Sequence, residues 1–310
     1  MTTYWWTKEF SVLKILYKFE LTILKSKKVN KDIKNISLTE NSVEKDALLP
    51  KDEFLKKFKI SSKAFELANI KWSELQKIHA DYIINQGLLQ GVEKDIITKF
   101  LTSDAKEAGV HSVRSRLKKP DSLIVKIIRK TIDANKKGLT KNIRLKNYTS
   151  EINDLIGIRI LHVFKNDWFG IHNFILSDCK YKTKEVPTVY YRKGDEKSFV
   201  NDCKRNGCDA KVHPKAYRSI HYIIDPYPRK KIVLVEIQVR TVFEDGWSEI
   251  DHKLRYVSKK GTKHVLDSYL LALNRIAGSA DEIGTLIKNR QAELRQEEYE
   301  RQLNSKRGKK

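Results

Sequence analysis

The apolar residues of the chain recur with two different periods, and the period changes along the sequence. Between residues 51 and 110 they lie three or four positions apart, as on one face of a helix. A second helix-like block covers residues 122–131, where apolar positions face lysine and arginine. Helical spacing returns over residues 243–256 and again from residue 265 to about residue 303.

Short runs rich in β-branched residues lie between these helical blocks. They predict strands over residues 152–164, 188–191, 217–224 and 232–241. Helices, then strands, then helices indicate an α+β fold with a mixed β-sheet flanked by helices. We expect a central domain over residues 106–260, a largely helical N-terminal extension (residues 1–105) of unknown role, and a C-terminal helical extension (residues 261–310).

Two of the predicted strands carry an acid among apolar neighbours. These are Asp154 in "INDLIGIRILHVF" and Glu236 in "VLVEIQVRT". An isolated buried charge is costly, so each acid needs a partner. One interpretation is that the two acids meet across the sheet and hold Mg²⁺, which takes one or two carboxylates plus phosphate oxygens. The other is that Arg159 neutralises Asp154 and Arg240 neutralises Glu236 for purely structural reasons.

The formal net charge is +23, and its excess is concentrated in one segment. Residues 111–150 contain 12 Lys or Arg against 2 Asp or Glu. A focused basic patch indicates a polyanionic partner, either nucleotide phosphates or a nucleic acid backbone. Its stretch "RSRLKKPDSLIVKIIRK" combines a predicted helix start, capped at Asp121-Ser122, with closely spaced cations. That arrangement favours a polyphosphate cradle, and a solvated basic face is the alternative. The cations are Arg114, Arg116, Lys118, Lys119 and Lys126.

The stretch "KAYRSIHYII" leads into another predicted strand. Tyr217 and His221 are spaced to lie on one face of it, close to Lys215. A tyrosine beside a phosphate-seeking lysine suits the stacking of a base. A surface tyrosine beside a solvated lysine is the alternative.

The sequence predicts neither a membrane span nor a secretory signal, because charged residues interrupt every apolar run. The cysteines are Cys179, Cys203 and Cys208, with no CxxC pair, which indicates a reducing setting and a cytoplasmic location. Cys203, Cys208 and His213 have neither the number nor the spacing of a zinc site, so we expect free thiols.

Taken together, four motifs resemble the synthetase domain of the RelA/SpoT family, the alarmone synthetases. The resemblance covers about residues 110–256. It implies a fold like that of nucleotidyltransferases, and the transfer of pyrophosphate from ATP to a ribose 3′-hydroxyl, leaving AMP. In order, the motifs are "SRLKKPDSLIVK", "DLIGIRI", "KAYRSIHY" and "EIQVRTVFEDGWSEIDHKLRY".

The resemblance also implies a role for each matching residue. Asp154 would bind Mg²⁺, and Glu236 would assist the metal or activate the attacking hydroxyl. Tyr217 would stack on the acceptor base, and Asp245 falls where the family reads guanine. The implied ATP site consists of Arg116 and Arg159 around the adenine, with Lys118, Ser122 and Lys126 at the phosphates. The other implied acceptor residues are Lys215, His221, Gln238 and Arg240.

The sequence departs from the family at Ala216, where glycine commonly precedes the stacking tyrosine. Some family members pyrophosphorylate GDP or GTP to make (p)ppGpp, whereas toxic small members modify the 3′-terminal adenosine of tRNA. We expect the guanosine nucleotide as acceptor and keep tRNA as the alternative. A catalytically inactive domain that only binds nucleotide or RNA ranks last, because both acids are present. A homo-oligomer and an antitoxin or regulatory partner are further expectations.

Overall fold

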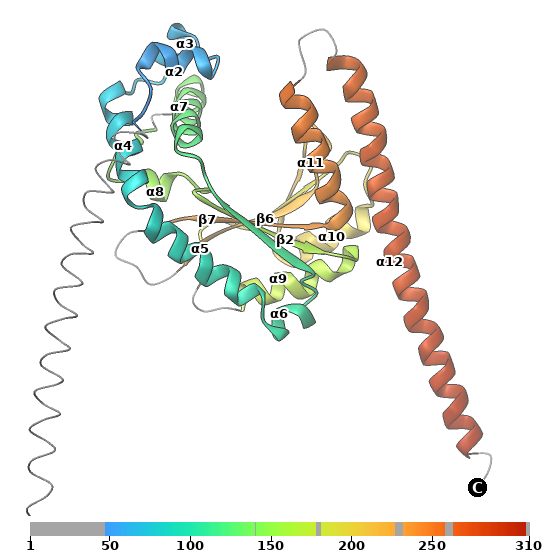
Figure 1. Ribbon diagram of the computed structural model, residues 1–310. Helices are drawn as coiled ribbons and strands as arrows, with labels where there is room; N and C mark the ends of the chain where they lie inside the picture. Colours follow the sequence, from blue (N-terminus) through green and yellow to red (C-terminus); the bar gives the residue numbers. More distant parts are fainter. Residues whose placement is uncertain (1–46, 140, 178–180, 227–231, 258–262, 308–310) are drawn as a thin grey trace, which may run out of the picture.

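The computed structural model describes residues 47–139, 141–177, 181–226, 232–257 and 263–307 (Figure 1). Within them, the centre of the molecule is a seven-stranded sheet of mixed direction. The strand order is β1-β2-β7-β6-β4-β5, and β3 pairs with β6. β2 and β7 run parallel, as do β4 and β5. The strands are β1 (Ser112–Leu117), β2 (Ile156–His162), β3 (Tyr181–Thr183), β4 (Thr188–Tyr191), β5 (Asp209–Val212), β6 (Ser219–Pro226) and β7 (Val235–Thr241).

Helices flank both sides of this sheet, which confirms the α+β prediction. α5, α6 and α9 lie on one side, whereas α7 and α11 lie on the other (Figure 1). The helices are α2 (Lys51–Lys57), α3 (Ser62–Glu66), α4 (Trp72–Ile84), α5 (Gln86–Phe100), α6 (Ser103–Glu107), α7 (Pro120–Lys136), α8 (Tyr148–Glu151), α9 (Trp168–Leu176), α10 (Lys197–Arg205), α11 (Val242–Val257) and α12 (Lys263–Arg307). A 3₁₀ turn, η1 (Lys165–Asp167), precedes α9.

The two faces of the sheet differ in polarity because side chains alternate along each strand. Ile158 of β2 lies opposite Ile237 of β7, and both are buried in the apolar core. The residue after each of them, Arg159 and Gln238, also forms a cross-strand pair and points to the opposite face. The sheet therefore has an apolar face against α5 and α9 and a polar face between α7 and α11 (Figure 1).

The described part of the N-terminal extension is helical and packs on the central domain. Phe54, Leu75 and Ile96 belong to the same buried apolar cluster as Ile124 of α7 and Ile158 of β2. α4 contacts α7, and α5 contacts β1 and β2. Residues 47–110 and the sheet thus share one core. Residues 1–46 lie outside the described part of the chain.

α12 is a single helix of 45 residues that extends away from the sheet (Figure 1). Its first half packs on α11 and η1, and its distal half carries the polar C-terminal sequence. Nowhere in the described residues is there a helix with the length and apolar character needed to cross a membrane.

Cys203 and Cys208 are buried free thiols, as expected. Burial raises the pKa of Cys203 to about 12 and that of Cys208 to about 11. The described residues contain no group of three or more His, Cys, Asp or Glu able to hold a metal ion. Cys179 lies outside the described residues.

Candidate active site

Six of the residues that the motifs indicated lie on the polar face of the sheet. Arg116 lies opposite Gly157 across β1 and β2, and Gly157 lies opposite Glu236 across β2 and β7. His221 of β6 lies opposite Gln238 of β7. Because paired residues share a face, the register brings together residues of four strands, β1, β2, β6 and β7. The six residues are Arg116, Arg159, His221, Glu236, Gln238 and Arg240.

Asp154 does not lie within a strand, contrary to the prediction. The chain turns at residues 153–155, and β2 begins only at Ile156. One carboxylate oxygen of Asp154 accepts a hydrogen bond from Lys118 Nζ at 2.6 Å, and the other lies 2.7 Å from Lys126 Nζ. The proposed structural pairing with Arg159 is therefore wrong. The two lysines of the basic segment neutralise Asp154 instead.

Glu236 also has different partners from the expected Arg240. Gln238 Nε2 donates to one of its oxygens at 2.6 Å, and His221 Nδ1 lies 3.5 Å from the other. Burial alone would raise the pKa of Glu236, but His221 and Gln238 more than offset it and lower that pKa to about 2. Glu236 is therefore an anion throughout the neutral pH range.

Lys126 connects the two acids. Its ammonium contacts Asp154 and is close enough to Glu236 to help lower the pKa of that carboxyl group. Oδ1 of Asp154 is buried and accepts no hydrogen bond from the described residues, and Lys126 contacts it as an ion pair. Two carboxylates beside a cleft lined by cations fit the ligand preference of Mg²⁺, which takes carboxylate and phosphate oxygens.

A cleft of about 790 Å³ opens beside Glu236 along α7. Lys118, Ser122 and Lys126 line it, as the phosphate-binding prediction requires. The cleft is also lined by four further cations, which were not assigned to the site from the sequence. They are Arg129, Lys130, Lys137 and Lys141. Arg129 and Lys130 lie on α7 with Ser122 and Lys126, so the helical period could have found these two, whereas Lys137 and Lys141 come after the helix ends at Lys136.

The start of α7 differs from the predicted cap. Lys119 is the N-cap and makes no side-chain capping bond, and Pro120 occupies the first turn. Asp121 instead accepts a hydrogen bond from Lys57 of α2 at 2.7 Å. The proline fixes the helix start without a side-chain cap. Asp121 connects the N-terminal extension to α7.

Tyr217 lies at the centre of a polar network. Its hydroxyl group is 3.0 Å from His221 Nε2, and it also contacts Gln238 and Arg240. The Arg240 guanidinium lies 4.9 Å from the centre of the Tyr217 ring. The structure therefore brings together four of the six predicted acceptor residues, Tyr217, His221, Gln238 and Arg240, with one face of the tyrosine ring against Arg240.

Asp245 is buried at the start of α11 and is surrounded by arginines. Its carboxylate lies 2.8 Å from Arg159, 3.2 Å from Arg114 and 3.6 Å from Arg240. Arg159 also contacts Glu249 at 2.6 Å. Arg114, which the sequence placed in the phosphate cradle, lies beside Asp245 instead, and Glu249 was not assigned to the site from the sequence. This end of the polar face is thus a compact ion-pair network.

The loop before β6 carries Lys215, whose side chain is exposed, and Ala216. Ala216 has a φ of 58°, which is the left-handed conformation that favours glycine. The alanine thus adopts a conformation that glycine would adopt at lower cost.

Comparisons with known proteins relate the chain to one family. A family model described as "Region found in RelA / SpoT proteins" matches residues 115–261. Residues 115–261 thus carry a region of the RelA/SpoT type. The chain is also similar to two Bacillus subtilis proteins. It is 26% identical to GTP pyrophosphokinase YwaC over 177 residues (56% of this chain, 71% of that protein), and 26% identical to GTP pyrophosphokinase YjbM over 206 residues (65% and 79%).

Two solved structures resemble the chain more distantly. One is a GTP pyrophosphokinase family protein from Streptococcus pneumoniae, with a TM-score of 0.48, 20% identity and coverage of 69% of this chain and 92% of that one. The other is the small alarmone synthetase 1 from Bacillus subtilis bound to its product pppGpp, with a TM-score of 0.46, 22% identity and coverage of 67% and 93%.

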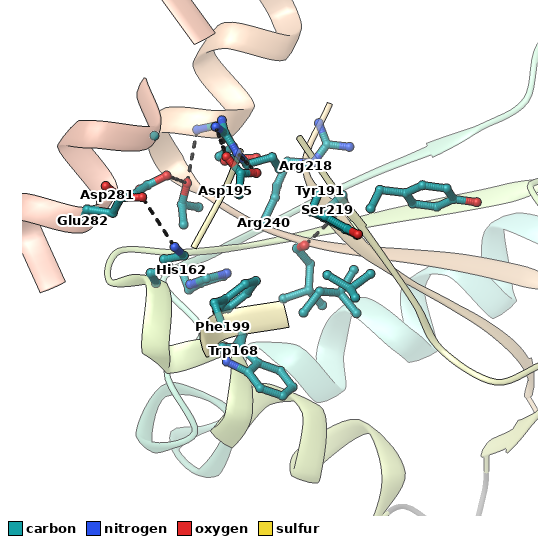
Figure 2. A pocket seen from close by; sticks show the side chains of 18 residues that line it. His162, Trp168, Tyr191, Asp195, Phe199, Arg218, Ser219, Arg240, Asp281 and Glu282 are labelled. Atoms are coloured by element: carbon teal, nitrogen blue, oxygen red, sulfur yellow. Dashed lines mark hydrogen bonds and ion pairs between the residues drawn. The ribbon is translucent and has the colours of Figure 1, made fainter. Parts of the chain in front are cut away.

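A buried group of charges lies beside the RelA/SpoT site, at the ends of β2 and β7 (Figure 2). It surrounds a small cavity of about 50 Å³. Arg218 forms two hydrogen bonds of 2.7 Å to Asp195 and lies 3.2 Å from Glu244. Burial raises the pKa of Glu244 to about 8 and that of Asp281 to about 6. We call Asp195, Arg218, Glu244 and Asp281 the α12 junction.

Proposed function

We propose that this protein is a pyrophosphokinase that transfers the β,γ-pyrophosphate of ATP to the 3′-hydroxyl of GDP or GTP. The observation that carries the proposal is the pair of carboxylates, Asp154 and Glu236, beside a cleft lined by cations. The family match over residues 115–261 and the names of the two Bacillus subtilis relatives support it.

In this reaction the oxygen of the acceptor 3′-hydroxyl bonds to the β-phosphorus of ATP, and the hydroxyl proton passes to solvent. The bond between that phosphorus and the oxygen bridging to the α-phosphate breaks, and AMP leaves with the bridging oxygen. Little covalent chemistry falls to the protein, so catalysis consists of positioning and charge neutralisation. Lys118, Ser122 and Lys126, which line the cleft at the start of α7, would hold the triphosphate.

We propose that Asp154 and Glu236 hold Mg²⁺. When bound, the metal ion would neutralise charge on the phosphate oxygens, as in other phosphoryl-transfer sites. Lys118 and Lys126, which neutralise Asp154 in its absence, would then be released to the phosphates. A carboxyl group with a pKa of about 2 is a weak base, so Glu236 suits metal binding better than proton abstraction.

On the acceptor side, Tyr217 and Arg240 would form the surface for the base, and the exposed Lys215 would contact phosphates. His221 would have to turn away from Tyr217 and Glu236 to reach them. Asp245 suits the N1–H and 2-amino groups of guanine. Its carboxylate already pairs with arginines, so reading guanine requires Arg159 to turn toward the nucleotide.

Transfer to tRNA is the second candidate. The cleft holds four cations beyond the three residues assigned to the triphosphate. A nucleic acid backbone would use such additional cations.

The test is a transfer assay with ATP labelled in the β- and γ-phosphates, the purified full chain and Mg²⁺. GDP, GTP and deacylated tRNA are offered in parallel. We expect label in the guanosine nucleotides. Label in tRNA alone would replace the first proposal by the second, and label in none of them would contradict both.

A further inference from the structure

The backbone of the acceptor loop is held in an unfavourable conformation. Ala216, between Lys215 and Tyr217, adopts a left-handed conformation that costs an L-residue about 1 kcal/mol or more. Such a conformation persists only where surrounding contacts determine it. The backbone N–H of Ala216 donates to the carbonyl of His213 at 3.0 Å. The other contact of this residue comes from α12.

Asn274 of α12 holds the carbonyl group of Ala216. Its side-chain nitrogen donates to that oxygen at 3.0 Å, and Asn274 is only 1% exposed. Leaving this buried carbonyl without a donor would destabilise the folded protein by about 1–3 kcal/mol. The contact joins two segments 58 residues apart. It fixes the acceptor loop to a helix that begins after the family match ends.

Arg218, directly after Tyr217, is fixed by the same helix. Two of its nitrogens donate to Asp195 (Figure 2). A third donates to the backbone carbonyl of Asn274 at 3.3 Å. Its side chain is 14% exposed. A planar guanidinium held by three hydrogen bonds has a single favourable position.

Gly278 provides the space that this position requires. It lies one turn after Asn274, and a β-carbon on it would be 2.8 Å from Nη2 of Arg218 and 3.1 Å from Cζ. Because Asp195 holds the guanidinium, the clash would displace Arg218 rather than be absorbed. A glycine inside a helix costs about 1 kcal/mol relative to alanine, so this space comes at the expense of helix stability.

The same face of α12 also contacts the start of α11. Asp281 accepts a hydrogen bond from Thr241 at 2.8 Å, and the Thr241 hydroxyl accepts from the backbone N–H of Glu244 at 3.1 Å. Asp245, in the arginine network, is the next residue. One helix face therefore contacts both segments that line the acceptor side of the site.

We infer that Asn274 and Gly278 of α12 are positioning residues for acceptor binding, acting through Ala216 and Arg218. The inference rests on the proposed transfer to an acceptor hydroxyl. It assigns α12 to the substrate site, although residues 274–278 lie beyond the matched residues 115–261.

The decisive variant is Gly278→Ala in the full chain. It should stabilise the helix but weaken acceptor binding, so a loss of helix stability could not explain the effect. Alanine favours the helix by about 1 kcal/mol. The same methyl group displaces Arg218, and we expect the KM for the acceptor to rise about tenfold. The KM for ATP should stay within about twofold, since Lys118 and Lys126 are not in contact with α12.

Gly284→Ala is the matched control. Gly284 lies on the same helix, and a β-carbon there would meet only Phe164, at an ordinary 4.0 Å. The Gly284→Ala variant gains the same helix propensity without a clash. Its KM values for the acceptor and for ATP should therefore match those of the wild type. Asn274→Ala is a second variant that removes the hydrogen bond without adding bulk. It should raise the acceptor KM more than the ATP KM.

Equal changes in both KM values, or no change in either for Gly278→Ala and Asn274→Ala, would overturn the inference. A wild-type chain that transfers to no acceptor would contradict the proposed function instead. In that case, backbone hydrogen exchange over residues 213–218 tests whether α12 positions the acceptor loop. Faster exchange in Gly278→Ala than in Gly284→Ala supports it, and equal exchange refutes it.

Discussion

Asp154 and Glu236 have carboxylates of the same chemistry in different surroundings. Lys118 and Lys126 contact Asp154, whereas a histidine and an amide contact Glu236. Burial lowers the pKa of Lys118, although its contact with Asp154 opposes the shift. In the proposed function a metal ion would replace the lysine contacts of Asp154, whereas the contacts of Glu236 keep that carboxylate ionised.

We predict that Asp154→Asn and Glu236→Gln each lower the transfer rate at least about 10²-fold. Each amide keeps the shape and one hydrogen-bonding oxygen but removes the charge that binds the metal. Initial rates at saturating ATP measure the effect, and the melting temperature checks the fold. Asp133→Asn is the control, because it removes a charge from an exposed residue of the same cleft. A Glu236→Gln variant with near wild-type activity would remove Glu236 from the proposed mechanism.

The strands show how far periodicity alone could predict the elements. β4 matches its predicted range, and α11 and α12 match theirs within a few residues at each end. β1 was missed because Arg114 and Arg116 occupy its polar face, so its alternation was interpreted as a basic segment. β2 was extended too far, because Ile152 and Leu155 remain buried while the chain turns.

The α12 junction could not be predicted from the pattern, because it combines a loop residue, a strand start and two helices. Arg218 is already bound by Asp195, whose pKa Arg218 lowers against the effect of burial. The second buried acid, Glu244, then has no full counter-charge, and burial raises its pKa. A proton on Glu244 is the consequence near neutral pH.

This proton makes stability depend on pH at the junction of α11 and α12. The pKa of Glu244 is about 8 in the folded protein against an ordinary value of 4.5. The folded chain therefore holds a proton that the unfolded chain releases, and this contribution to stability is complete below pH 4.5. It falls as the pH rises through 8, by up to a few kcal/mol.

We predict that Glu244→Gln flattens this decline between pH 5 and pH 8, because glutamine cannot ionise. Urea unfolding at several pH values measures the free energy of unfolding for both proteins. Glu282→Gln is the control, since Glu282 is exposed and adjacent to Asp281 on α12. Parallel curves for wild type and Glu244→Gln would show that Glu244 is ionised in the folded state at neutral pH.

At the scale of the molecule, the motifs located the residues but not their connections. Sequence order placed the phosphate-binding segment, the two acids and the acceptor loop in one domain. It could not show that Lys126 lies between the acids, or that α12 holds the acceptor loop, because such contacts depend on the packing of distant elements. The concentrated positive charge was visible in the sequence, and the structure places much of it along one cleft.

Removing positive charge from that cleft should distinguish tRNA from GDP or GTP as the acceptor. Arg129 and Lys137 are exposed cations of the cleft, and neither has been assigned to ATP. If tRNA is the acceptor, the variant Arg129→Gln/Lys137→Gln should raise the KM for tRNA. It should also reduce the slope of log affinity against log salt by about 2, one for each lost phosphate contact.

If GDP or GTP is the acceptor, as we propose, the same double variant should leave the acceptor KM within about twofold, because α7 lies away from Tyr217 and Asp245. Lys136→Gln is the control, since Lys136 is an exposed cation of the same helix outside the cleft. Steady-state rates at two or more salt concentrations, with each acceptor, measure both quantities. A large, salt-dependent rise in the KM for GDP would contradict the placement of the nucleotide acceptor near β6 and α11.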